Sequence, residues 1–298
     1  MNNDSLLPIH FFTIVLDGQP YINYHINVLK KLKIPWHWHI VEGLAELNHD
    51  TAWSASNGGK APHTRYPNCR SNDGTSEYLD SISKANPSQI SIYRKPIGHF
   101  WDGKIEMVRA PLPSIKESCI IWQIDSDELW TEEQIATMHR AFQDEPNRTA
   151  AFFWCQYFVG PDKIISTRNC YGNNSSYEWL RVWRFDPGMQ WIAHEPPTLG
   201  VIAGNGKIYN SALINPFKHH ETEELGLIFQ HMSYTTEAQL QFKELYYGYT
   251  GATKAWRALQ QNPYPAILLR NYFNWVKDHS IVESASKRGI KPLQLPPF

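Results

Sequence analysis

The strongest constraint on the fold is an alternation of apolar runs and helical patterns over the first half of the chain. Residues 9–16 form a short apolar run rich in β-formers, which is typical of a buried strand. A turn follows, and Pro20 is well placed at the first turn of the next helix. Residues 36–41 then read as a second strand. This order predicts parallel strands joined by a right-handed crossover.

The same alternation continues to about residue 145. Further helices are predicted over 75–82, 101–112 and 131–142, and further strands over 89–95 and 119–124. The predicted fold class is therefore α/β, with a Rossmann-like, mostly parallel sheet flanked by helices. The second half is less regular. It is expected to hold strands at 150–159 and 178–185, an irregular stretch over 186–231, and then a C-terminal helical segment that includes a helix near 266–278.

The composition is that of a globular protein. Of the 298 residues, 42% are hydrophobic and 19% are charged. A net charge of -1 argues against nucleic-acid binding, which relies on excess positive charge. No apolar stretch approaches the ~20 residues of a membrane span, and the first residues do not resemble a signal peptide. Four widely spaced cysteines without a CxxC motif predict reduced thiols and a cytoplasmic location, with peripheral membrane contact still open.

Aromatic residues are unusually frequent, with 12 Trp, 15 Tyr and 13 Phe. Most are expected in the core, but rings of this kind also form platforms for the apolar faces of ligands, including sugars. His37 and His39 alternate with tryptophans, so both histidines should lie on one face of a strand. We interpret them as part of a mixed polar face and not as a metal site.

Polar residues follow the predicted strands where each of them ends. In open parallel sheets, ligands bind beyond the carboxyl ends of the strands. The topology therefore predicts one rim that carries Asp17-Gly18, Glu42-Gly43 and the acidic cluster of IDSDELW at 124–130.

Within this acidic cluster, Asp125 and Asp127 are two positions apart and point the same way on an extended segment. Two carboxylates at the mouth of a sheet suit Mg²⁺ or Mn²⁺, which are commonly held by one or two carboxylates and by substrate phosphates. The alternative is that Asp127 and Glu128 only favour the N-terminus of the helix at 131–142 through its dipole. The rim position favours the cation, with Glu128 turned toward that helix.

Several segments, in this order, resemble GT-A glycosyltransferases, especially the inverting, family-2-like enzymes. The D-x-D after a fourth strand is the most specific of them. The others are IVLDGQPYINYHI, HIVEG, NDGTSEYLD and WDGKIEMVR. The resemblance covers about residues 9–231, and an insertion at 44–72 departs from the family pattern.

This resemblance implies transfer of a sugar from a nucleotide-diphosphate donor, most simply a UDP-sugar, to a glycan, lipid-linked or protein acceptor. It implies Mn²⁺ or Mg²⁺ as cofactor and inversion at the anomeric carbon. The implied catalytic domain covers 1–235, with a nucleotide-binding part over about 1–145 and an acceptor-side part over about 146–235. Residues 236–298 would form a helical extension.

The resemblance also suggests roles for individual residues. Asp125, Asp127 and His231 would hold the metal, although His231 could equally be a structural histidine. Glu195 is the candidate base, because Pro196 and Pro197 stiffen the loop after it; Asp186 is the fallback. The expected donor-binding residues are Asp17, Gly18, Glu42, Asp73, Lys104, Arg109, Asp125 and His194.

Two other readings remain open. One is a sugar-nucleotidyltransferase on a related sheet, which would favour a Gly-rich, basic loop after the first strand, and DGQP at 17–20 lacks that character. The other is a non-catalytic carbohydrate-binding protein that uses the aromatic residues on its surface.

Overall fold

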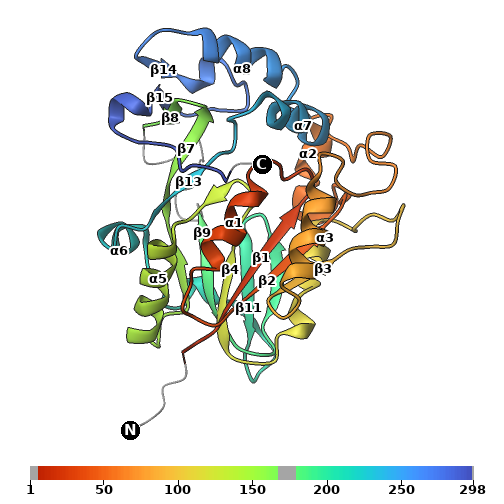
Figure 1. Cartoon of the computed structure of the whole chain (residues 1–298), viewed down its shortest axis with the longest axis vertical. Coiled ribbons are helices and arrows are strands. Elements are labelled where there is room, and N and C mark those ends of the chain that lie inside the picture. Colours follow the sequence, from red (N-terminus) through yellow and green to blue (C-terminus); the bar gives the residue numbers. More distant parts are fainter. Residues whose placement is uncertain (1–5, 167–178, 297–298) are drawn as a thin grey trace.

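The computed structural model describes residues 6–166 and 179–296, and its centre is a six-stranded sheet (Figure 1). The strand order in this main sheet is β3-β2-β1-β4-β9-β6. Its strands are β1 (Ile9–Val15), β2 (Trp36–Glu42), β3 (Ile90–Tyr93), β4 (Cys119–Gln123), β6 (Ala150–Phe152) and β9 (Leu180–Phe185).

Strands β1 to β4 are mutually parallel, and β9 runs antiparallel to both of its neighbours. This confirms the predicted α/β class with a mostly parallel sheet. The continuous apolar runs have a simple cause, since the strands are covered on both faces. All five residues of β4, for example, are buried.

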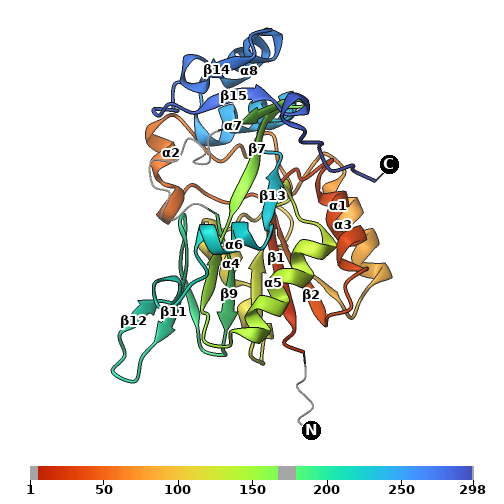
Figure 2. The same ribbon diagram turned by 90° about the vertical axis from the view of Figure 1, so that its left-hand side faces the viewer.

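Helices α1 (Ile22–Leu29), α3 (Thr75–Ala85) and α5 (Glu132–Asp144) cover one face of the main sheet (Figures 1 and 2). Helix α4 (Lys104–Arg109) and a small antiparallel sheet cover the other. That small sheet consists of β10 (Gln190–His194), β11 (Pro197–Ile202) and β12 (Ile208–Asn210). The two cores between these layers contain five fully buried tryptophans, at positions 38, 122, 130, 183 and 191. The aromatic content is therefore largely core packing.

A second six-stranded sheet has the order β14-β15-β8-β7-β13-β5. Its strands are β5 (Glu128–Leu129), β7 (Trp154–Gly160), β8 (Lys163–Ile165), β13 (Ile228–His231), β14 (Ala266–Leu268) and β15 (Ile281–Ser284). Helices α6 (His219–Glu224), α7 (Glu237–Tyr247) and α8 (Ala252–Gln261) belong to this half. Figure 1 shows α7, α8 and the β14–β15 pair above the main sheet.

Three sequence predictions for the second half are wrong. The helix near 266–278 is instead β14 and a short 3₁₀ turn, because Ile267 and Leu269 are buried and β14 pairs with β15. The irregular stretch over 186–231 contains the small antiparallel sheet, α6 and β13. The single strand over 150–159 is two strands that join different sheets on either side of Phe153.

The insertion at 44–72 contains a 3₁₀ turn (His49–Thr51) and the one-turn helix α2 (Trp53–Ser56). A small core of Leu44, Leu47, Tyr66 and Cys69 packs it against Tyr246 of α7. The insertion therefore packs directly against helix α7. Cys69 and Cys119 are free thiols, and Cys170 lies outside the described residues.

Candidate functional site

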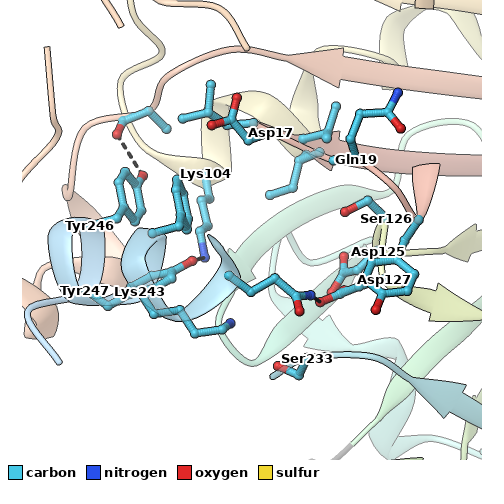
Figure 3. A pocket seen from close by; sticks show the side chains of 18 of the residues that line it. Asp17, Gln19, Lys104, Asp125, Ser126, Asp127, Ser233, Lys243, Tyr246 and Tyr247 are labelled. Atoms are coloured by element: carbon cyan, nitrogen blue, oxygen red, sulfur yellow. Dashed lines mark hydrogen bonds between the residues drawn. The ribbon is translucent and has the colours of Figure 1, made fainter. Parts of the chain in front are cut away.

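A cavity of about 1350 Å³ lies between the carboxyl edge of the main sheet and α7 (Figure 3). The sheet edge contributes the turn after β1, the segment after β4 and Lys104 of α4. The opposite wall comes from α7 and the segment after β13. Of the residues predicted for the site, those on the cavity wall are Asp17, Gly18, Asp73, Lys104, Asp125, Asp127, His194, Glu195 and His231.

Two short strands bring the acidic cluster to His231. Strand β5 contains Glu128 of the cluster and pairs antiparallel with β13, so that His231 lies opposite Glu128. As a result, His231 Nε2 is 3.5 Å from Asp127 Oδ1. Burial alone would raise the pKa of Asp127, but His231 and Lys243 lower it to about 2. Asp127 is therefore a carboxylate at any physiological pH.

Glu128 does not turn toward helix α5, which corrects the sequence prediction. It is fully buried, and both of its oxygens accept hydrogen bonds from Arg181 at 2.6–2.9 Å. The N-terminus of α5 is capped by Thr131 and Gln134 instead. Burial raises the pKa of Glu128 despite the guanidinium of Arg181. Arg181 also lies 3.4 Å from Asp125 Oδ2, so one arginine compensates two acids of the cluster.

Helix α1 contacts the backbone of the acidic cluster. The Nε2 atom of buried His25 lies 2.9 Å from the carbonyl oxygen of Ser126. Burial lowers the pKa of His25 to about 4, so the imidazole is neutral and this nitrogen donates its hydrogen to the carbonyl. The position of the cluster is thus set by a contact 101 residues apart in the chain.

The turn after β1 is fixed by the segment 71–75. Three successive backbone amides, of Asp17, Gly18 and Gln19, donate to the side chains of Ser71, Thr75 and Asp73, respectively. Gly18 is needed here because a Cβ atom would lie 2.7 Å from Val15 Cγ2. The predicted site residues Asp17 and Asp73 therefore do meet at one edge of the cavity, although the insertion lies between them in the sequence.

At the other end of the cavity, Glu195 forms an ion pair with Lys104, whose amine also contacts the hydroxyl of Tyr247. Burial would raise the pKa of Glu195, but the ammonium of Lys104 outweighs it and lowers that pKa. The same pairing raises the pKa of Lys104 against the effect of burial. Both groups are charged near neutral pH, and Lys104 is already engaged by protein.

His194 lines the cavity beside this ion pair. Its side chain is 8% exposed, and neither ring nitrogen makes a hydrogen bond within the described residues. Burial and the nearby Lys104 lower its pKa, so the imidazole is neutral. Unsatisfied buried polar atoms are costly, and they are uncommon away from functional sites.

Three residues at or beside the cavity were not identified from the sequence. Lys243 of α7 extends into the cavity (Figure 3). Its amine lies over the rings of Tyr234 and Tyr247, 4.9 and 5.9 Å from their centroids, and makes no hydrogen bond or ion pair to the described residues. Asp50 and Trp53 of the insertion contact the backbone and side chain of Glu195. Lys243 lies on the cavity-facing side of an ordinary amphipathic helix, whose sequence pattern does not mark one lysine as functional. The insertion has no periodic pattern, so the sequence did not single out Asp50 or Trp53 either.

Two predicted donor-binding residues are not on the cavity wall. Glu42 is buried and accepts hydrogen bonds from Arg94, Ser76 and the amide of Ser71. Arg109 donates twice to the carbonyl oxygen of Trp191, at 2.7 and 2.9 Å. Both side chains are used in joining segments of the fold. Asp186, the fallback base, likewise lies outside the wall and accepts from Ser118.

Within residues 6–166 and 179–296, no three His, Cys, Asp or Glu side chains are placed to hold a metal ion by themselves. None of the helices in these ranges combines the length and apolar character needed to cross a bilayer.

The fold and the cavity together define an α/β protein with a charged ligand site at the carboxyl edge of its main sheet. No protein-family model matches the chain, and no curated protein matches it either. Among solved structures, residues 1–349 of S. aureus TarS are 12% identical with a TM-score of 0.38, over 60% of this chain and 47% of that one. A 4-diphosphocytidyl-2C-methyl-D-erythritol synthase is 10% identical with a TM-score of 0.35, over 77% of this chain and 92% of that one. Likenesses this distant carry no argument about the reaction.

Proposed function

We propose that the protein is a metal-dependent glycosyltransferase that moves a sugar from a nucleotide-diphosphate donor, most simply a UDP-sugar, to an acceptor hydroxyl with inversion. The observation that carries this proposal is the meeting of Asp127 and His231 on the wall of a large cavity, where Lys243 has no ion pair with the described residues. A cavity of 1350 Å³ exceeds the roughly 300–1,000 Å³ of most small-molecule sites, and therefore has room for two substrates.

The pair formed by Asp127 and His231 fits a divalent cation. Two donors that each lie about 2.1 Å from one octahedral ion are about 3 Å apart, close to the observed 3.5 Å. Asp125, on the same wall, is a further oxygen donor. Because two or three protein ligands do not fill the shell, the remaining positions suit diphosphate oxygens, as is common for Mg²⁺ and Mn²⁺. The ion would stabilise the charge that develops on the leaving diphosphate.

The protein's own positive charge supports the same placement of the diphosphate. Burial lowers the pKa of Lys243, while Asp127 favours its charged form. Among the described residues this amine has ring contacts with Tyr234 and Tyr247 but no hydrogen bond or ion pair, so it gains a charge-assisted hydrogen bond when a phosphate oxygen arrives. We therefore assign diphosphate binding to Lys243, which replaces Lys104 in that role because Lys104 is paired with Glu195.

Glu195 is the proposed base. Its Oε1 faces Lys104, and its Oε2 accepts one hydrogen bond from Trp53 Nε1 at 3.2 Å, which leaves a lone pair for an acceptor hydroxyl. The acceptor oxygen forms a bond to the anomeric carbon as the bond from that carbon to the diphosphate breaks. The electron pair leaves with the diphosphate, and the hydroxyl proton passes to Glu195.

The alternatives have less support. A nucleotidyltransferase would use a basic loop after the first strand, whereas the amides of this turn are occupied by Ser71, Asp73 and Thr75. A non-catalytic sugar-binding protein has no use for the buried acids and the lysine that faces the cavity. The free thiols of Cys69 and Cys119 support the proposal that the protein works in the cytoplasm.

Thermal unfolding of the purified protein with UDP-, GDP- and TDP-sugars, each with and without Mn²⁺, tests this function. We expect one nucleotide class to raise Tm in a metal-dependent way, because only the folded state binds it. Asp127→Ala should remove that shift, while Asp144→Asn, at an exposed acid on α5, should keep it. If no nucleotide sugar raises Tm, or if Asp127→Ala responds like the unchanged protein, the proposal is wrong.

A further inference from the structure

The insertion at 44–72 makes direct contacts with the proposed base. Asp50 Oδ2 accepts hydrogen bonds from the backbone amides of His194 and Glu195. Trp53 Nε1 donates to Glu195 Oε2 at 3.2 Å. Two residues of one short segment therefore hold both the backbone and the carboxylate of Glu195. The position of Glu195 depends on the insertion, which belongs to the same end of the site.

Trp53 is also a large exposed aromatic surface at this end. It remains 42% exposed, although its ring stacks on Tyr247 with parallel planes and ring centroids 6.0 Å apart. Tyr249 lies 6.2 Å away at an angle and itself stacks on Trp275. The aromatic surface thus continues outward from the ion pair of Lys104 and Glu195, on the side of the cavity away from Asp127.

The charges at the two ends of the cavity indicate which kind of ligand each end could bind. Lys104 neutralises Glu195 and His194 is neutral, so the remaining charged group described at this end of the cavity is Asp50, whose carboxylate is used by two backbone amides. The opposite end carries Asp125 and Asp127, and the amine of Lys243 interacts with both acids more strongly than with Glu195. A charged diphosphate suits the Asp127 end, whereas a neutral ligand with an apolar face and many hydroxyl groups suits the Trp53 end.

We propose that Trp53 and Glu195 form an acceptor subsite, and that the acceptor is a carbohydrate whose pyranose ring packs on the indole of Trp53. This inference rests on the proposed function and names the substrate class of the same site. A pyranose has one apolar C–H face, which matches an exposed aromatic ring, and hydroxyl groups at its edge. Because the indole nitrogen of Trp53 hydrogen-bonds to Glu195, a ring on that indole has its edge hydroxyls beside the carboxylate. The buried nitrogens of His194 offer partners for a neighbouring hydroxyl.

The test is binding of the full chain to an array of immobilised oligosaccharides, in the presence of UDP and Mn²⁺. We expect the unchanged protein to retain a defined set of glycans. Trp53→Ala should weaken that binding roughly 10-fold, which corresponds to about 1.4 kcal/mol, near the upper end of what an aromatic contact contributes. Trp53→Tyr, which keeps a ring, should restore most of it. Tyr264→Ala removes a more exposed aromatic residue, 71% against 42% for Trp53, in the segment before β14, and should have no effect.

UDP binding by the same variants separates the two proposals. If UDP binds in a metal-dependent way but no glycan is retained, or if Trp53→Ala retains glycans as well as the unchanged protein, the acceptor subsite is refuted while the proposed function stands. Retention of peptides or lipids in place of glycans would also refute it. If UDP does not bind at all, the proposed function fails, and the acceptor subsite fails with it.

Discussion

Two polar clusters lie on the main sheet, and they differ in whether their histidines have hydrogen-bond partners. In the amino half of β1 and β2, the rings of His10, His37 and His39 stack with centroids 4.4–5.9 Å apart. His39 hydrogen-bonds with His10 and with Tyr93, both at 2.9 Å. At the carboxyl edge, by contrast, His194 has two buried nitrogens without partners and His231 has one, within the described residues.

The difference shows that proximity of histidines is a poor guide to a site. The first cluster, called the histidine stack from here on, satisfies its own hydrogen bonds and has no use for a ligand. The rim histidines are fewer and farther apart in sequence, but they have polar atoms without a hydrogen-bond partner among the described residues, which a ligand in the cavity can satisfy. The following predictions test whether this contrast separates structure from function, beginning with the largest effect.

The largest effect should come from the rim, at Glu195. Glu195→Gln keeps the shape of the side chain but removes the proton acceptor, so turnover should fall about 10²- to 10⁴-fold. Turnover can be measured as UDP release from the UDP-sugar that gives the largest thermal shift, with water as acceptor. UDP affinity should be unchanged, since Glu195 lies away from the Asp127 end. Glu224→Gln, at an exposed acid, is the control. Undiminished turnover would move the base to another residue.

The second prediction concerns His231. His231→Ala should weaken UDP binding in Mn²⁺ by at least the roughly 10- to 100-fold that loss of an outer-shell partner costs a metal site. Binding in EDTA should not change, because the histidine is proposed to act through the ion. Titration calorimetry measures both conditions, with the exposed His220→Ala as the matched control. Equal affinity of His231→Ala and the unchanged protein in Mn²⁺ would make His231 a structural residue.

How much of this site the sequence could predict depends on the range of the contacts involved. The shared position of the rim acids could be predicted from topology, because the carboxyl ends of parallel strands meet at one edge of the sheet. His231 was suggested by the family resemblance, and the structure puts it beside Asp127. Glu42 was misassigned because its partner Arg94 lies 52 residues away, and no local pattern reveals such a pair.

The same limit explains the errors in the fold. Strand β5 has only two residues and exists because β13 pairs with it 100 residues later. Strand β14 sits in a segment rich in apolar residues that also fits a helix, and its pairing with β15 decides the outcome. Trp53 and Asp50 lie in an insertion without periodicity. Their contacts with Glu195, about 140 residues away, appear only in three dimensions.

The third prediction concerns the histidine stack and pH. Burial and the neighbouring His37 and His10 lower the pKa of His39 to about 2, whereas the unfolded chain protonates near 6.5. Stability is therefore fully present above pH 6.5 and is lost as pH falls below it. Between pH 7 and 5, a histidine that stays neutral in the fold lowers the free energy of unfolding by about 2 kcal/mol.

Urea unfolding at pH 7 and pH 5 measures this loss. His39→Leu should reduce the difference between the two pH values by about 2 kcal/mol, because the group no longer titrates. Exposed His99→Gln should leave the difference as it is. Among the described residues, the carboxylate that contacts the stack is that of Glu117, 3.6 Å from His10 and 64% exposed. An unchanged pH dependence in His39→Leu would mean that protons bind elsewhere.

The smallest expected effect comes from replacing one histidine of each cluster by leucine and comparing the two variants. His39→Leu at pH 7 breaks two partly buried hydrogen bonds, to His10 and to the Tyr93 hydroxyl, which should cost about 1–3 kcal/mol although Tyr93 keeps its bond to Ser114. His194→Leu breaks no hydrogen bond to a described residue, so the free energy of unfolding should change by about 1 kcal/mol or less, or rise. UDP release should fall in His194→Leu and stay normal in His39→Leu. If His194→Leu instead lost stability and kept its activity, the unpartnered nitrogens would mark a structural position, and the contrast between the two clusters would no longer locate the site.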